Sequence, residues 1–348
     1  MTKLECSAIR AYAILAIAIH NYCHWLPNTP QENEFEFEVG RHWDFIHSMG
    51  TASDILVNLF SYLGHLGVPV FVFLSGYGLS QKYGQTETVQ LKSFLTTHYI
   101  KLLKPLLIGL LVYVFVMYLK EGEWPSFRTF ALQCLMLQNL IVPFERFGSP
   151  EPYWYFGMTM QLYVIYILFV YKRSLRWLTV LTVFSLILLV FLGSIDAYLP
   201  FFVWMKYNSI GWLLPFLLGV IASRYAGTKL FKLNKGYMAA IMLLCAVLLI
   251  ILDSQFLTWL LIPAISVVLT ICFILIQPQA AQQVAAGIGS ISMYIFVIHP
   301  IIRELTIDIG YYGNPYWGLL VYVSLTLFLA FMVKKGIDYS RSRTTKGR

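Results

Sequence analysis

The sequence predicts an all-α, polytopic membrane protein with about ten transmembrane helices and both termini in the cytoplasm. Three observations support this fold class: 58% of the 348 residues are hydrophobic, only 12% are charged, and long uncharged tracts recur from end to end. Soluble domains usually carry about twice this fraction of charge. The composition therefore excludes a disordered chain, a fibrous repeat and an ordinary cytosolic enzyme.

Ten tracts are apolar, free of charge and of a length that approaches or meets a membrane span. They are residues 11–26, 55–81, 105–119, 152–171, 177–194, 207–223, 236–252, 254–276, 285–302 and 309–333. No small-residue cleavage site follows the first tract, which predicts a retained signal anchor. Proline and amide residues at 277–283 divide the uncharged stretch from 254 to 302 into two spans.

Positive charge gathers on one side of this topology. The segments on the same side as the termini hold 19 of the 25 Lys and Arg residues but only 3 of the 17 acidic residues. Basic loops remain in the cytoplasm, so this side is expected to be cytoplasmic. The net charge of +8 then reflects membrane orientation, and no nucleic acid is expected as a partner.

The apolar segment 130–144 is short for a span, and a crossing there would turn the later basic loops outward. We expect it to be an interfacial or re-entrant piece on the outer side. Residues 1–335 are expected to form the membrane domain, and residues 336–348 a basic cytoplasmic tail. The five scattered cysteines include no C-x-x-C pair, so neither a disulfide framework nor a thiolate metal site is indicated.

Ionisable residues inside a span are costly, which makes them functional candidates. Arg10 lies at the start of the first span, and His20 follows ten residues later, about 15 Å along a helix. Arg10 can instead snorkel to lipid phosphates, and His20 can be a hydrogen-bonded structural histidine. His20 and His24 have the i, i+4 spacing of metal ligands. No carboxylate lies between them, so no metal is expected.

The second span contains GHLGVPVFVFLSGY at 64–77, where glycine and proline predict a break or kink. Ser75 is a polar group in this span, and with Gly76 it is also typical of a small-residue packing surface. Lys101 and Lys104 share one helix face before the third span. They are either cytoplasmic anchors or a clamp for phosphate.

Two later spans add polar groups. Tyr155 belongs to an aromatic cluster typical of the outer membrane interface. Gln161, in the same apolar helix, requires a hydrogen-bond partner. His299 precedes Pro300, which leaves the carbonyl of Phe296 without its helical donor. His299 is therefore either a structural partner there or a second imidazole of the site.

These motifs together resemble the integral-membrane acyltransferase-3 family over residues 3–335. The resemblance rests on Arg10 with His20, on GVPVFVFLSGYGLS at 67–80, on YWYFGMTMQLY at 153–163 and on ISMYIFVIHP at 291–300. The family consists largely of bacterial O-acyltransferases that acetylate exported glycans. Lys101 and Lys104 stand where it usually has an Arg-x-x-Arg pair.

The resemblance implies a multi-pass enzyme of the cell inner membrane, surrounded by lipid, that modifies polysaccharide by O-acetylation. The donor would be acyl-CoA, most often acetyl-CoA, and the acceptor a glycan or a lipid-linked sugar. A neutral imidazole can take the proton of a sugar hydroxyl, so His20 is expected to be the general base. Tyr155, Gln161 and Ser75, in falling order, are candidate donors to the oxyanion. The candidate catalytic residues are His20, Arg10, Tyr155, Gln161, His299 and Ser75, and the candidate donor-binding residues are Arg10, Lys101 and Lys104.

Two questions stay open at this point. The acidic, aromatic stretch QENEFEFEVGRHWD at 31–44 is either a solvated loop over the helices or part of an acceptor vestibule. A polytopic transporter of a small solute or glycan precursor would also explain the helices, the broken second span and the buried histidines. Transporters often contain inverted repeats, and none is detected here.

Overall fold

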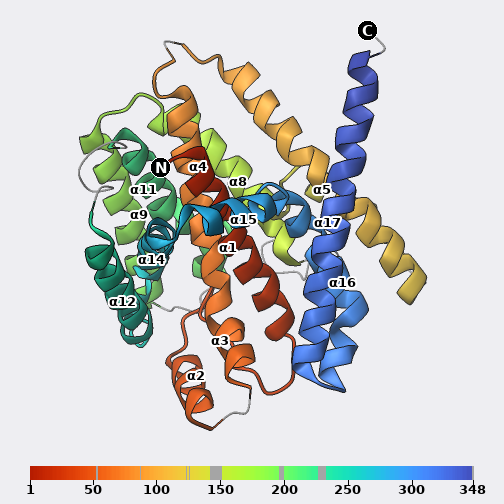
Figure 1. Ribbon diagram of the computed structural model, residues 1–348. Coiled ribbons are helices and arrows are strands. Elements are labelled where there is room, and N and C mark those ends of the chain that lie inside the picture. Colours follow the sequence, from red (N-terminus) through yellow and green to blue (C-terminus); the bar gives the residue numbers. More distant parts are fainter. Residues whose placement is uncertain are drawn as a thin grey trace.

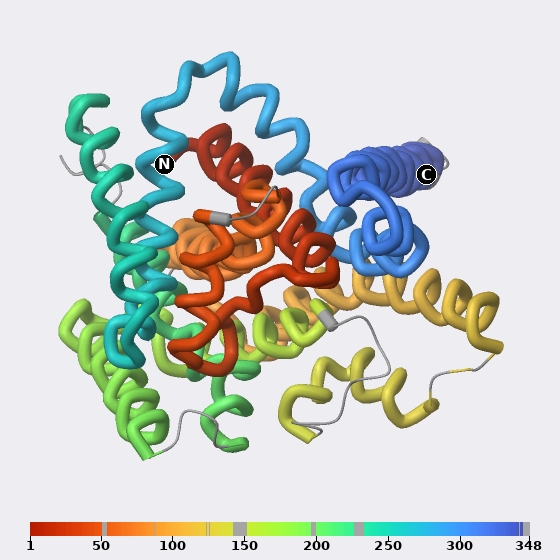
Figure 2. Tube along the Cα trace, turned by 90° about the horizontal axis from the view of Figure 1, so that it is seen from below, coloured from red at the N-terminus to blue at the C-terminus, as the bar shows by residue number. Residues whose placement is uncertain are grey.

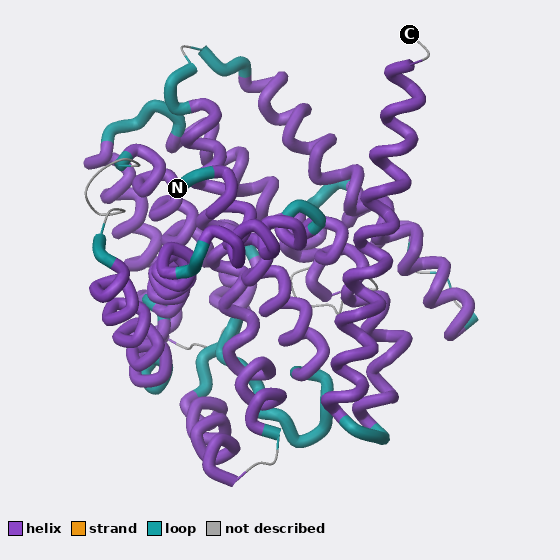
Figure 3. Tube along the Cα trace, viewed as in Figure 1, coloured by secondary structure: helices purple, strands orange, loops and turns teal. Residues whose placement is uncertain are grey.

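The structure, a computed structural model, describes residues 1–51, 54–86, 88–122, 124, 126–141, 151–195, 200–225 and 233–346. Every regular element in these ranges is helical, which confirms the all-α prediction (Figure 3). The helices of the first half are α1 (Lys3–Cys23), α2 (Val39–Thr51), α3 (Ile55–Leu63), α4 (Gly67–Tyr83), α5 (Leu91–Glu121), α6 (Phe127–Cys134), α7 (Gln138–Ile141) and α8 (Trp154–Ile165). Those of the second half are α9 (Leu175–Ile195), α10 (Pro200–Tyr207), α11 (Leu213–Arg224), α12 (Lys235–Leu252), α13 (Phe256–Trp259), α14 (Ile262–Ile276), α15 (Gln279–Gly289), α16 (Ser292–Tyr311) and α17 (Pro315–Lys346).

The first helix, α1, lies among α3, α4, α15 and α16. It begins with a capping box, in which the Thr2 hydroxyl accepts from the Glu5 amide at 3.1 Å and the Glu5 carboxylate accepts from the Thr2 amide at 2.7 Å. In Figure 1, α15 crosses α1, and a Cβ on Gly289 would overlap the carbonyl oxygen of Ser7. Close backbone approach through small residues is typical of helix contacts in membranes.

Where a break or kink is predicted in the second span, the structure has a 3-10 turn within one continuous helical span, Ile55–Tyr83. α3 passes into a short 3-10 helix, η1 (Gly64–Leu66), which continues as α4. The other irregular helices are η2 (Glu151–Tyr153), the π-helix η3 (Tyr166–Val170) at the end of α8, and η4 (Ser209–Trp212) between α10 and α11. In lipid, such breaks persist only where neighbouring groups satisfy the freed backbone.

Two boundaries differ from the sequence prediction. The amide-rich residues after Ile276 begin α15 instead of forming a loop, and the chain bends by 61° between α15 and α16, inside the tract 285–302. The third span begins earlier than expected, because α5 is one 31-residue helix with Pro105 in its interior. Lys101 and Lys104 therefore belong to the spanning helix itself. Figure 2 shows α17 nearly end-on and α5 from the side, so these long helices are strongly inclined to each other.

The count of ten spans is not confirmed. Five helices in the described ranges are long and apolar enough to cross a membrane, and up to seven if each bent pair is one span. The segment 130–144 forms the short helices α6 and α7 as far as Ile141. Neither is among the candidate spans of the described residues, whereas residues 142–144 lie outside them. Both termini lie in the upper half of Figure 1, and the compartment they face stays a prediction.

Candidate active site

His20 lies on α1 in the interior of the bundle and is only 6% exposed. Its Nδ1 is 3.2 Å from the carbonyl oxygen of Phe60, near the end of α3 where that helix gives way to η1. A carbonyl oxygen can only accept, so Nδ1 donates and Nε2 carries the lone pair of the neutral ring. His20 can therefore accept a proton through Nε2 while the carbonyl of Phe60 orients the ring.

The 3-10 turn in the second span brings a further imidazole to His20. His65 lies in η1 and is buried, and its ring centroid is 5.7 Å from that of His20. A Cβ on Gly64 would lie 2.6 Å from the Cβ of His20, so η1 approaches α1 closely only because this residue is glycine. The sequence predicts a break or kink here but not the pairing of His65 with His20.

His24 and Glu32 complete this group. The ring centroid of His24 is 5.2 Å from that of His20, and its Nδ1 is 2.7 Å from Oε2 of Glu32. Burial raises the pKa of Glu32, but the contact with His24 and the nearby imidazoles outweigh it and hold this pKa well below its ordinary value. Glu32 is thus an ionised carboxylate beside the histidines. Its role is not evident from the sequence, because it depends on how the loop after α1 folds back against that helix.

Glu32 belongs to the 27–38 loop, which folds into the bundle. Asn33 is 3% exposed, and its carbonyl accepts a 2.6 Å hydrogen bond from the indole of Trp259. The ring of Phe35 stacks on that of Tyr207 in α10, and their centroids are 3.9 Å apart. Burial raises the pKa of Glu34 well above its ordinary value. This part of the loop is therefore not solvated, and the aromatic residues between the acids anchor it.

A second polar group surrounds Arg10, towards the N-terminal end of α1. Arg10 is exposed, and its charge acts on Lys101 of α5 and on Tyr155 and Tyr163 of α8. Ser75 of α4 lies close to both tyrosine hydroxyls. Two cations and three hydroxyl groups from four helices thus lie within electrostatic range of one another, on the side predicted to be cytoplasmic. Such a set suits an anionic ligand such as a phosphate.

Helix α1 itself connects the two polar groups. Arg10 and His20 are separated by about 15 Å of helix. A chain of aromatic contacts runs beside it: the ring of Tyr155 is 5.3 Å from that of Phe296, which is 5.8 Å from the ring of His299. A ligand held near Arg10 would therefore have to extend along α1 to reach His20.

The family of the chain follows from a comparison with protein-family models. A model described as an acyltransferase domain matches residues 5–335, nearly the whole chain. The chain belongs to the acyltransferase-3 family. No curated protein and no solved structure matches it. Family membership identifies a membrane acyltransferase in general terms and favours this function over a transporter.

The acyltransferase carries Lys101 and Lys104 one helical turn apart on α5, and both side chains are exposed. Of the two, Lys101 lies within electrostatic range of Arg10. His98, one turn before Lys101, is a residue that the sequence analysis did not single out. Its Nε2 is 3.1 Å from the hydroxyl of Tyr83, and its ring is 4.8 Å from that of Tyr163. It therefore borders the Arg10 group.

Gln161 of the acyltransferase lies apart from both polar groups. Its amide donates to Oδ1 of Asn208 at 2.6 Å and accepts from the backbone amide of Ser209 at 3.0 Å. Asn208 is the N-cap of η4, so Gln161 satisfies backbone freed by the break between α10 and α11. Asn208 and Ser209 are thus the hydrogen-bond partners that a glutamine in an apolar helix requires. These bonds favour a structural role, and a role as oxyanion donor stays a prediction.

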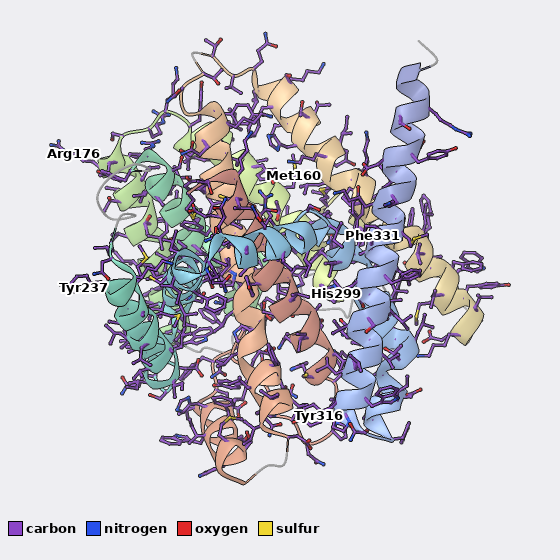
Figure 4. All side chains as sticks on the ribbon, viewed as in Figure 1. Met160, Arg176, Tyr237, His299, Tyr316 and Phe331 are labelled. Atoms are coloured by element: carbon purple, nitrogen blue, oxygen red, sulfur yellow. The ribbon has the colours of Figure 1, made fainter. Side chains whose placement is uncertain are left out.

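His299 is fully buried near the middle of the acyltransferase (Figure 4). Its Nδ1 is 3.1 Å from the carbonyl oxygen of Ile295, one turn earlier in α16. Among the described residues its Nε2 has no hydrogen-bond partner, and the ring is close enough to His20 for their charges to interact. The ring also interacts with the carbonyl of Phe296, so both interpretations made from the sequence stay predictions.

Proposed function

We propose that the protein transfers an acyl group, most simply acetyl, from acyl-CoA to a hydroxyl of a cell-surface glycan or of its lipid-linked precursor. The proposal places it in the inner membrane of a bacterial cell. The observation that carries the proposal is the pairing on α1 of an exposed Arg10 with a buried His20, whose Nδ1 meets a backbone carbonyl. Membership of the acyltransferase-3 family supports acyl transfer in general.

The donor would bind with its phosphates at the Arg10 group. Arg10 and Lys101 provide positive charge there, and Lys104 lies one turn further on. The hydroxyls of Tyr155 and Tyr163 lie within the electrostatic range of Arg10. CoA has an extended arm, which suits the length of α1 between Arg10 and His20. The thioester would then lie beside His20, within the bundle.

In the reaction, Nε2 of His20 removes the proton of the acceptor hydroxyl as its oxygen attacks the thioester carbonyl. The carbonyl becomes an oxyanion, which needs hydrogen-bond donors in a dry site. Tyr155 and Ser75 offer hydroxyls, and His299 offers a second buried imidazole. Collapse of the intermediate breaks the C–S bond, and the thiolate takes the proton from His20 to leave as CoA.

Mass spectrometry of exported glycans from cells with and without the gene tests this function. We expect a mass difference of one acyl group on one sugar, which would identify the acyl group and the acceptor together. Purified protein should release CoA from acetyl-CoA only when that acceptor is present. Identical glycans in both strains, together with no acceptor-dependent CoA release, would contradict the proposal.

Replacing both Lys101 and Lys104 with alanine is expected to raise the KM for acyl-CoA about tenfold and to change kcat less. The tenfold figure corresponds to the loss of one charge-assisted hydrogen bond, about 1.5 kcal/mol, between the two exposed lysines and the phosphates. Steady-state kinetics of purified protein measures this split. Lys92→Ala is the matched control, because Lys92 is also exposed on α5. Equal KM values for the double variant and the control would assign the lysines to topology alone.

A further inference from the structure

The His20 group has the donor atoms of a metal site. One ligand atom each from His20, His24 and Glu32 lies within 4.8 Å of the others, and no other such group of three His, Cys, Asp or Glu side chains occurs in the described ranges. From the sequence no metal is expected, because α1 contains no carboxylate between the two histidines. The 27–38 loop supplies that carboxylate from outside the helix.

The contact between His24 and Glu32 is short. Nδ1 of His24 and Oε2 of Glu32 are 2.7 Å apart. Two electron-rich atoms at this distance repel each other unless a proton or a cation lies between them. A proton on Nδ1 would bridge them as an ion pair, and a cation bound to both atoms would satisfy both as well.

The distances and the surroundings suit zinc. Zinc binds imidazole nitrogen and carboxylate oxygen at about 2.0–2.2 Å in a tetrahedron, which separates donors by about 3.3 Å. The separations here, from 2.7 Å to at most 4.8 Å, bracket that value. A metal-binding histidine usually donates its other N–H to a backbone carbonyl or carboxylate, as Nδ1 of His20 does to Phe60.

A fourth donor is close by. His65 is buried, its ring is 5.7 Å from that of His20, and its Nδ1 has no hydrogen-bond partner within the part of the chain that the structure describes. Two histidines and a glutamate form a known zinc ligand set, with the fourth position left to water, substrate or another side chain. A carboxylate from Glu32 would supply the negative charge that a dication needs.

We propose that His20, His24 and Glu32 bind a transition-metal dication of the Zn²⁺ class, with His65 adjacent, and that the bound ion switches off acyl transfer. The second part rests on the proposed function. His20 has one free lone pair, on Nε2, because Nδ1 donates to Phe60. That lone pair can hold the ion or take the acceptor's proton, but not both.

Zinc binding to the purified full-length protein tests the site directly. After treatment with EDTA, the wild type should bind about one Zn²⁺ per chain by calorimetry and elemental mass spectrometry. Glu32→Gln and His24→Gln should weaken binding about tenfold or more. Glu36→Gln, in the same loop, and His47→Gln, an exposed histidine of α2, serve as matched controls and should bind like the wild type. Thermal unfolding without metal checks that each variant folds.

Equal zinc affinity in the wild type and the Glu32→Gln variant, or no stoichiometric binding at all, would overturn the site. Binding is measured without substrates, so this result stands even if the protein transfers no acyl group. For the second part, Zn²⁺ should suppress acetyl transfer by the wild type, and EDTA should restore it. Full activity in zinc-saturated protein would overturn the switch and leave the binding site established.

Discussion

His20→Ala should abolish acyl transfer while the protein still folds and inserts. A positioned general base typically accelerates proton transfer by about 10²–10⁴-fold. His20 is 6% exposed, so bulk water has little access to replace it as base. The assay is CoA release by the purified protein with acetyl-CoA and a glycan acceptor.

His20→Gln is a second variant for the case in which alanine leaves a cavity that impairs folding. Its amide can still donate to the carbonyl of Phe60 but cannot take a proton, so it should be as inactive as alanine. His47→Ala, in an exposed position on α2, is the control and should retain activity. If either folded His20 variant transferred acetyl at the wild-type rate, His20 would not be the base.

Gly76→Ala and Gly219→Ala should each strongly destabilise the fold. The two glycines lie where α4 and α11 cross: a Cβ on Gly76 would overlap the carbonyl oxygen of Phe216, and a Cβ on Gly219 would overlap that of Phe73. Backbone cannot move aside as a flexible side chain can, so the helices would separate. Overpacking in a core costs about 1–3 kcal/mol, and a clash with backbone on a main helix contact belongs at the upper end.

Thermal unfolding in detergent, with size-exclusion chromatography, measures this effect. Gly78→Ala is a closely matched control, because Gly78 lies two residues further along α4 with nothing within 4 Å of an added Cβ. This variant should unfold like the wild type or at a slightly higher temperature, since alanine favours helix. Unfolding of Gly76→Ala at the same temperature as Gly78→Ala would show that the α4–α11 contact is not tightly packed.

Features of the fold that depend on neighbouring residues were predictable from the sequence, whereas features that depend on helix packing were not. Hydropathy and Gly-Pro spacing are local properties, and they correctly predicted helices throughout. They also predicted a break or kink before α4, where the structure has a 3-10 turn within a continuous span. These local properties did not predict the bend between α15 and α16. The whole stretch from 254 to 302 is uncharged, so no charged residue marks where one helix ends and the next begins. Its position is set where Gly289 packs against the backbone of α1, a contact between residues far apart in the chain.

The residues of the candidate site also fall into those that the sequence indicates and those that only the tertiary structure brings together. The sequence by itself determined a helical membrane protein of the acyltransferase-3 family with Arg10 and His20 on one helix, because hydropathy and helical rise depend on neighbouring residues. Only the tertiary structure brought Glu32 and His65 to His20 and Ser75 to Tyr155. It also showed that the side-chain amide of Gln161 forms hydrogen bonds with Asn208 and Ser209 at the start of η4. Such contacts depend on how loops and helices pack, and no local pattern in the sequence encodes them.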